Sequence, residues 1–220
     1  MLGPITGDHW LLFVADYCER PSHESTDRTI DIMMYDIDPN VARLFEASSQ
    51  CPDGKTASKL SGISELLPGS QIQEWLFEPC GYSMNGTLFE TYWTIHITPE
   101  SHCSYASFES NIKTRSYGAL INAVLRIFQP RRFTMTLFAD EYGLRELDDT
   151  PYRNKICPFS KGMENCWYKL SARSESDFMG DYRSMVGNYH LIKPEGEPKA
   201  HVPISESKHT STDIERCSTI

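Results

Sequence analysis

The sequence has neither a long hydrophobic run nor an excess of basic residues. No stretch of about 18 apolar residues occurs in the 220-residue chain, so the sequence predicts no membrane-spanning helix. The amino terminus has no basic region followed by an apolar stretch, so we expect no secretory signal. The formal net charge is −9, whereas a surface that binds nucleic-acid phosphates needs clustered lysine and arginine. The charge argues against nucleic-acid binding and fits a soluble protein or one that holds a cationic ligand.

Cysteine pairs at zinc-binding spacing are also missing. The seven cysteines, at positions 18, 51, 80, 103, 157, 166 and 217, form an odd and scattered set without a Cys-x-x-Cys pair. We therefore expect neither a metal site nor a disulfide framework. Reduced thiols are typical of cytosolic proteins, so the sequence predicts a cytoplasmic location.

The apolar residues, 40% of the chain, are sufficient for a substantial core. Their spacing predicts strands at residues 9–17, 27–37, 73–77, 92–98, 103–109, 133–139 and 166–172, and helices at 38–45, 57–67 and 116–128. Strand–helix–strand units do not recur, so we expect an α+β domain on an antiparallel sheet covered by helices. Polar residues, proline and lysine dominate from residue 193 onward. We expect one folded domain over 1–192 and a disordered polar tail over 193–220.

Three helix boundaries carry recognisable signals. Asp38 can cap a helix that has Pro39 at its first position. Ser116 can cap the helix that runs to Phe128. The pair at 68–69, Pro-Gly, should stop the helix that precedes it.

The most informative stretch is Phe-Glu-Pro-Cys-Gly-Tyr-Ser-Met-Asn-Gly at 77–86, followed by Tyr-Trp-Thr-Ile-His-Ile-Thr-Pro-Glu at 92–100. We expect the first segment to form a turn carrying Cys80 and Ser83, and the second to form a strand carrying His96. A turn beside a strand can bring Ser83 within hydrogen-bonding reach of His96. This is the geometry of a hydroxyl polarised by an imidazole.

A structural histidine and a turn serine are the alternative interpretation of the same pair. A lone serine and histidine are more often structural than catalytic, and the sequence supplies no third member of a triad. Residues 81–85 also do not match the Gly-x-Ser-x-Gly nucleophile elbow. The pattern therefore does not favour a serine hydrolase.

Taken together, these blocks resemble the signature of eukaryotic S-adenosylmethionine decarboxylase. Residues 77–86, 92–100 and the following Ser-Tyr-Ala-Ser-Phe-Glu at 104–109 occur in the family's order and nearly at its spacing. Residues 62–70 and 133–138 are similar as well. The resemblance is clear over about residues 3–140 and fades after that.

The resemblance implies a lyase of spermidine and spermine biosynthesis, made as a zymogen that cleaves itself at a serine. Cleavage converts that serine to a pyruvoyl group, which forms a Schiff base with S-adenosylmethionine and serves as the electron sink for decarboxylation. By resemblance, Ser83 and His96 assist the self-cleavage, Phe77 stacks on the adenine, and Glu100 binds the ribose hydroxyls. Cys80 does not match the family's catalytic cysteine, so we interpret it as a packing residue.

A second site is predicted on the strand that begins at Asp27. Asp27, Thr29 and Asp31 share one strand face because side chains alternate along a strand. A solvent-exposed polar face is the simpler interpretation. In animal members of the family the matching positions, with that of Glu109, form an acidic site for putrescine. The resemblance therefore implies a putrescine site, although Asp31 stands where the family commonly has glutamate.

The chain lacks the family's self-processing serine, which lies in a Ser-Glu-Ser-Ser type segment of the first part of the proenzyme. The nearest string, Ser-Glu-Ser at 205–207, stands in the polar tail. We expect this chain to supply the second half of an αββα sandwich, to be inactive alone, and to expose a large apolar patch where the first half would pack. The alternatives are a fragment of an active decarboxylase, a catalytically dead regulatory partner subunit, and a non-catalytic small-molecule binding domain. Dimerisation is implied by the resemblance alone.

Overall fold

The structure is a computed structural model that describes residues 1–2, 6, 9, 11–13, 26–159, 165–178 and 182–193. The strand predicted at 9–17 lies mostly outside these residues, and its described residues, 9 and 11–13, are not in a strand. The tail predicted from 193 onward lies outside them except for its first residue. Among the described residues no helix is long and apolar enough to cross a membrane.

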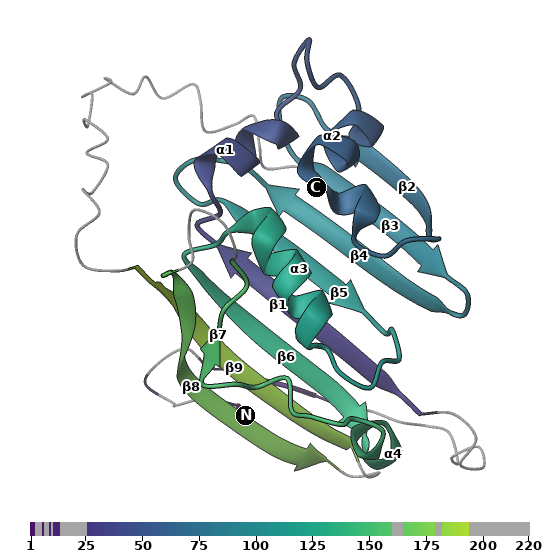
Figure 1. Cartoon of the computed structure of the whole chain (residues 1–220), viewed down its shortest axis with the longest axis vertical. Coiled ribbons are helices and arrows are strands. Elements are labelled where there is room, and N and C mark those ends of the chain that lie inside the picture. The colour runs from purple at the N-terminus through teal and green to yellow at the C-terminus, as the bar shows by residue number, and fades with distance from the viewer. Residues whose placement is uncertain are drawn as a thin grey trace.

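The described strands form one antiparallel sheet of nine strands in the order β2-β3-β4-β5-β1-β6-β9-β8-β7 (Figure 1). The strands are β1 Arg28–Tyr35, β2 Gln71–Leu76, β3 Tyr82–Leu88, β4 Thr91–Thr98, β5 Tyr105–Ser110, β6 Arg132–Asp140, β7 Lys155–Ile156, β8 Trp167–Phe178 and β9 Tyr182–Ile192. The helices are α1 Pro39–Ala42, α2 Gly54–Ser61, α3 Gly118–Phe128 and α4 Glu141–Arg145, with 3-10 turns η1 Arg43–Phe45 and η2 Ile63–Glu65. The α+β class with an antiparallel sheet is confirmed.

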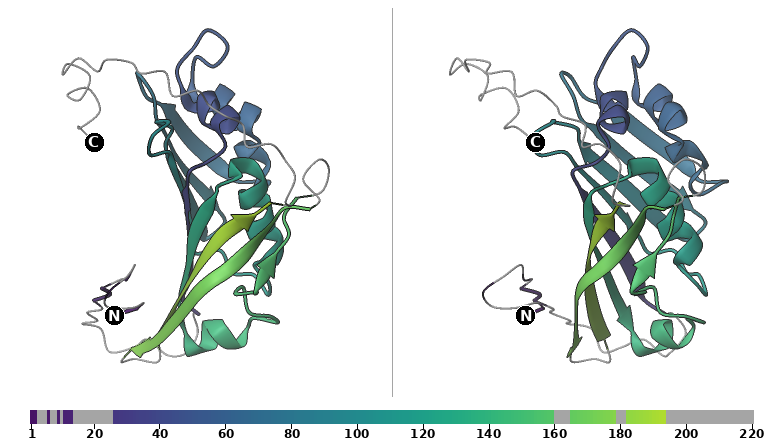
Figure 2. Two further views of the ribbon diagram at one scale, coloured as in Figure 1. Left: turned by 90° about the vertical axis from the view of Figure 1, so that its left-hand side faces the viewer. Right: turned by 60° about the vertical axis from the view of Figure 1, so that its left-hand side comes forward.

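Helices α1, α2 and α3 cover one face of the sheet and leave the other face open (Figure 2). Burial along β1 alternates strictly, so that Ile30, Ile32 and Met34 are completely buried while Thr29 and Asp31 are partly exposed. Such alternation follows from the period of two in a strand. The core therefore lies between the sheet and the helices, and polar side chains are directed to the open face.

The segment at 82–88, predicted as part of a turn, is instead strand β3. The turn prediction was wrong because the segment's own alternation was overlooked: Tyr82 and Met84 are buried, whereas Ser83 and Asn85 are not. The tight turn precedes the strand at Gly81, whose φ of +114° suits a residue without a Cβ.

Three helix boundaries also differ from the prediction. Helix α2 begins at Gly54, because the Asp53 carboxylate accepts a hydrogen bond from the Thr56 amide at 2.7 Å. It ends at Ser61, because Gly62 adopts the left-handed conformation that terminates helices. Before α3 the capping position is Tyr117, which makes no side-chain cap, rather than Ser116. The prediction at Asp38 is confirmed, since its carboxylate accepts a hydrogen bond from the Asn40 amide.

The strand predicted at 166–172 is longer, and its partner was not predicted. Strand β8 extends to Phe178 and pairs with β9 along its length. Much of β8 carries alternating charged and hydroxyl residues with few apolar ones, so its hydrophobic signal stops early.

The expected large apolar patch on the open face is not found in the described strands. Of the large apolar side chains on the described strands, Trp75 is the one that is exposed, at 48%. Serine, threonine, asparagine, tyrosine, histidine and carboxylate side chains occupy the open-face positions of β3, β4 and β5. An antiparallel sheet can expose one polar face while its other face packs on a core.

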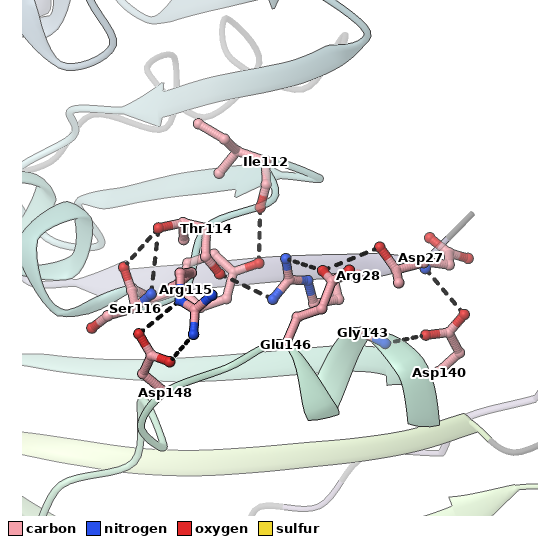
Figure 3. Close-up of polar contacts among 12 residues, drawn as sticks. Asp27, Arg28, Ile112, Thr114, Arg115, Ser116, Asp140, Gly143, Glu146 and Asp148 are labelled. Carbon is pink, nitrogen blue, oxygen red and sulfur yellow. Dashed lines mark hydrogen bonds and ion pairs between the residues drawn. The ribbon is translucent and has the colours of Figure 1, made fainter. Parts of the chain in front are cut away.

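A buried arginine ties the first residue of β1 to distant segments on the helical side (Figure 3). The Arg28 side chain is 1% exposed; one NH2 group donates to the Thr114 carbonyl at 3.0 Å and the other to the Glu146 carboxylate at 3.2 Å. Its guanidinium also lies 5.9 Å from the centre of the Tyr117 ring. Gly143 packs so closely that a Cβ there would be 2.5 Å from Arg28 Cγ. Arg28 therefore joins β1, the loop before α3 and the α4 segment.

Replacing Gly86 by alanine should destabilise the fold by about 1–3 kcal/mol, because overpacking strains a closely packed core. A Cβ at Gly86 would lie 2.2 Å from Trp93 Nε1, and Trp93 is completely buried. The indole would have to move away from Ser70 Oγ, to which it donates a hydrogen bond at 3.1 Å. Urea unfolding followed by tryptophan fluorescence measures the loss.

The matched control is Gly118→Ala at the start of α3, where the nearest atom to the new Cβ is 3.6 Å away. This variant should be as stable as the parent or more stable, since alanine favours helix. Equal stability of the Gly86→Ala variant and the parent would contradict the close packing described above.

Candidate active site and acidic cluster

Ser83 and His96 lie directly opposite each other on the open face. Ser83 is on β3 and His96 on β4, and the two are register partners in that antiparallel pair. The Ser83 hydroxyl is 2.9 Å from His96 Nδ1, a hydrogen-bonding distance. The sequence predicted this pairing, although the serine is held by a strand rather than by a turn. A strand fixes the serine backbone through ladder hydrogen bonds, which orients the hydroxyl toward the imidazole.

Phe77 and Glu100 lie beyond the same end of the sheet. Phe77 follows β2, and its amide donates to the Gly81 carbonyl at 2.9 Å, which folds the chain back into β3. Glu100 follows β4 on the neighbouring side of β3. Glu100 Oε2 is buried and has no hydrogen-bond partner among the described residues. A buried carboxylate oxygen without a donor is costly, so this oxygen is suited to accept hydrogen bonds from a ligand.

Cys80 lies in the segment between β2 and β3. Its backbone forms an isolated antiparallel bridge with Glu46, and its side chain is partly buried. The packing role inferred from the sequence stays a prediction.

Asp31 and Glu109 form an acidic pair on the same face. They are register partners on β1 and β5, and Thr136 of β6 faces Asp31 from the other side. The Thr136 hydroxyl donates to Asp31 Oδ2 at 3.2 Å. Burial, followed by repulsion from Glu109, raises the pKa of Asp31 from 3.8 to about 6. Asp31 and Glu109 are two of the four residues predicted for a putrescine site, and a third, Thr29, joins them through Tyr92.

Tyr92 completes the cluster from β4. Its hydroxyl donates to Glu109 Oε1 at 2.6 Å, and the Thr29 side chain reaches the same hydroxyl. Burial and the Glu109 contacts raise the pKa of Tyr92 to about 12, so the phenol stays protonated near neutral pH. Tyr92 and Thr136 were missed as site residues. Tyr92 shares the polar strand face with His96, and that alternation was the available signal.

Asp27 stands apart from the acidic pair. It precedes β1 and is exposed, and its Oδ2 accepts a hydrogen bond from the Tyr182 hydroxyl at 3.0 Å. Four residues along a strand separate Asp27 from Asp31, a distance of about 13 Å. The described residues contain no group of three or more histidine, cysteine or acidic side chains that could hold a metal ion.

The raised pKa of Asp31 predicts a pH-dependent stability. The folded state binds the Asp31 proton more tightly than the unfolded state, so this contribution is complete below about pH 3.8 and is lost as pH rises through about 6. Relative to the parent, Asp31→Asn should become more stable by on the order of 2–3 kcal/mol between acidic and neutral pH. Urea unfolding at several pH values gives the difference.

Asp27→Asn is the control, because it removes an exposed carboxylate at the end of the same strand. A stability difference between Asp31→Asn and the parent that does not change with pH would contradict the assignment.

Comparison with known proteins identifies the family. The family model described as adenosylmethionine decarboxylase matches residues 1–190. The S-adenosylmethionine decarboxylase proenzyme of Dictyostelium discoideum is 40% identical over 192 residues, which is 87% of this chain and 48% of that protein. The proenzyme of Xenopus laevis is 42% identical over 144 residues, 64% of this chain and 42% of that protein. The chain thus spans about half the length of these relatives.

A solved structure shares the fold. The crystal structure of the Trypanosoma brucei AdoMetDC-delta26 monomer superposes with a TM-score of 0.63 at 28% identity, covering 76% of this chain and 66% of that chain. With the family match over most of the sequence, the chain belongs to the adenosylmethionine decarboxylase family.

Proposed function

We propose that this chain supplies the second half of an S-adenosylmethionine decarboxylase, in which Ser83 and His96 assist self-cleavage. The observation that carries the proposal is the 2.9 Å contact between Ser83 Oγ and His96 Nδ1, on neighbouring strands of a polar face. Membership in a family whose relatives are named proenzymes supports it.

The two side chains have complementary proton chemistry. A neutral imidazole accepts a proton at Nδ1, and the hydroxyl that it faces can donate one or accept one. His96 is exposed, so its ring can reach a reacting group on the open face. We assign to His96 the removal of a proton during breakdown of the ester intermediate, and to Ser83 the orientation of the ring.

Phe77 and Glu100 would bind the substrate beside this pair. The ring of Phe77 offers a stacking surface to the adenine, and the two oxygens of Glu100 suit two neighbouring ribose hydroxyls. The buried, unpartnered Glu100 Oε2 supports this role. The pyruvoyl group of this family supplies the electron sink for loss of CO₂. The residues present fit such a site, because they place hydrogen-bonding groups and an aromatic at one end of a polar face.

The serine that would become the pyruvoyl group is not among the residues that match the family signature. We therefore propose that this chain alone does not decarboxylate, and that the serine is supplied by another polypeptide segment of the same family. Binding of the open face by a first-half segment is consistent with its polar character, since the face carries hydrogen-bonding groups that a second layer could satisfy.

Reconstitution tests the assignment of Ser83 and His96. We expect no CO₂ release from the chain alone, and self-cleavage with CO₂ release when it is co-expressed with the first half of the Dictyostelium proenzyme. His96→Ala should slow cleavage by about 100-fold or more, because general acid–base groups contribute at least that factor. Ser83→Ala should slow it as well. Intact-mass measurement detects the cleavage and the pyruvoyl terminus.

Asn85→Ala is the matched control, because Asn85 lies on the same face of β3 two residues from Ser83 and is exposed. It should leave cleavage unchanged. Cleavage at the parental rate in the His96→Ala variant would contradict the proposal. If the chain raises the turnover of a complete, already processed homologue without forming a new pyruvoyl terminus, the regulatory-subunit interpretation is favoured instead.

We also propose that the acidic cluster binds putrescine. Asp31 and Glu109 present two carboxylates on adjacent strands, and Thr29 and Tyr92 supply neutral hydroxyls around them. A diammonium ligand would relieve the repulsion that contributes to the raised pKa of Asp31. Asp27 lies at the outer end of the same strand face and would contribute at longer range.

Putrescine at millimolar concentration should therefore raise the thermal unfolding midpoint of the chain near neutral pH, because a ligand that binds the folded state stabilises it. The increase should diminish below about pH 6, where Asp31 is protonated, and should be absent in Asp31→Asn and Glu109→Gln. 1,4-Butanediol, with the same carbon chain and no charge, is the ligand control. An unchanged midpoint with millimolar putrescine at neutral pH would exclude this site in the chain.

A further inference from the structure

A row of basic side chains lies on the open face of β6, β9, β8 and β7, on the side of the sheet away from Ser83. Arg132 of β6 is the register partner of His190 on β9, His190 is the partner of Lys169 on β8, and Lys169 is the partner of Lys155 on β7. Register partners point to the same face of a sheet, and their Cβ atoms lie about 4.5–5.5 Å apart. Tyr35 of β1 continues the row beyond Arg132. Four strands thus place basic groups side by side in a chain of net charge −9.

Like charges directly opposite each other on neighbouring strands are destabilising. Within the described residues the counter-charge of this row is Asp36, whose carboxylate binds Arg132 Nε at 3.3 Å. That contact uses Nε, so the terminal NH2 groups of the guanidinium can donate elsewhere. Farther along β8 the carboxylates of Glu175 and Asp177 are paired with other arginines. The row therefore carries more positive than negative charge within the described residues.

A β-bulge adds a hydroxyl to the row. The register of β8 against β9 shifts between Leu170 and Ala172, which leaves Ser171 as the extra residue. Its hydroxyl lies 2.5 Å from His190 Nδ1. If the hydroxyl donates, Nε2 of the neutral ring carries the proton, and if the ring is protonated both nitrogens are donors. In these two states His190 presents an N–H donor at Nε2, whereas in the other neutral tautomer Nδ1 donates to Ser171 and Nε2 is an acceptor.

Of this row, Arg132 and His190 line a hollow of about 330 Å³, together with Tyr35, Thr134, Ser171 and Asn188. Lys169 lies next to the hollow as the register partner of His190. The Thr134 hydroxyl and the Asn188 side-chain oxygen are 2.8 Å apart, so that the amide NH2 of Asn188 can donate to a ligand. The ring of Tyr35 lies 4.4 Å from the Arg132 guanidinium carbon and restricts the orientation of that group. Donors from three strands and a bulge therefore meet at one concave site.

We propose that this hollow, which we call the Arg132–His190 site, binds a small multivalent oxyanion of the phosphate class. Arginine, lysine and hydroxyl donors are the groups that bind phosphate oxygens in proteins. Four strand spacings separate β9 from β4, which places the site about 19 Å from His96. The site shares no residue with the Ser83–His96 pair or the acidic cluster, although it lies on the same open face.

Calorimetric titration of the full chain with pyrophosphate and with inorganic phosphate, at constant ionic strength, tests the proposal. We expect saturable binding with one anion per chain and tighter binding of pyrophosphate. Arg132→Gln and Ser171→Ala should each weaken binding by about fivefold or more, since loss of one charged or hydroxyl donor costs on the order of 1 kcal/mol. Both side chains are exposed, so neither variant should disturb folding.

Lys59→Gln is the matched control, because it removes one positive charge from α2 on the opposite face and should bind pyrophosphate as the parent does. If Lys59→Gln weakened pyrophosphate binding equally, the anion would be attracted by the overall charge of the chain rather than by a site, and the proposal would be overturned. Lack of saturable binding by the parent chain would also overturn it. As a second measurement, pyrophosphate should shift the imidazole NMR signals of His190, assigned with His190→Gln, more than those of His96.

Discussion

Side-chain alternation along the paired strands decides which residues reach the helices and which reach the open face. Because register partners share a face, the alternation of β1 is transmitted to β5 and β4 on one side and to β6 and β9 on the other. A shift of β1 by one residue would move Asp31 into the core, and the same shift of β4 would move His96 there. Both polar clusters and the row of basic residues therefore depend on one register, which the buried side chains maintain.

The open face contains three chemically distinct zones. Ser83 and His96 lie toward β2, the Asp31–Glu109 pair lies at the centre, and the Arg132–His190 site lies toward β7. The acidic pair lies between His96 and the basic side chains of the Arg132–His190 site, and in the described structure it contacts neither. Such separation allows each zone to bind a ligand of different charge on one surface.

Much of this arrangement could be predicted from sequence. The alternation around Ile30 and the signature around His96 identified the sheet class, the Ser83–His96 contact and the acidic face. Strand β3 was missed because glycines in the signature were taken as turn formers, whereas Gly86 is needed for the close approach of Trp93. Strand β9 and the bulge at Ser171 depend on long-range pairing that a local pattern does not contain. For Asp27 the sequence predicted too much. Asp27 shares a strand face with Asp31, but residues on one face need not belong to one site.

The buried Arg28 has a consequence for local opening motions. If α4 and its flanking residues detached from the sheet, the guanidinium would lose the Glu146 carboxylate and keep the Thr114 carbonyl as its hydrogen-bond acceptor within the described residues. Detachment of this short helix is therefore coupled to release of the start of β1, the central strand of the sheet. The amide hydrogens of α4 should accordingly exchange with solvent through a cooperative opening shared with β1, rather than through independent fraying of a surface helix.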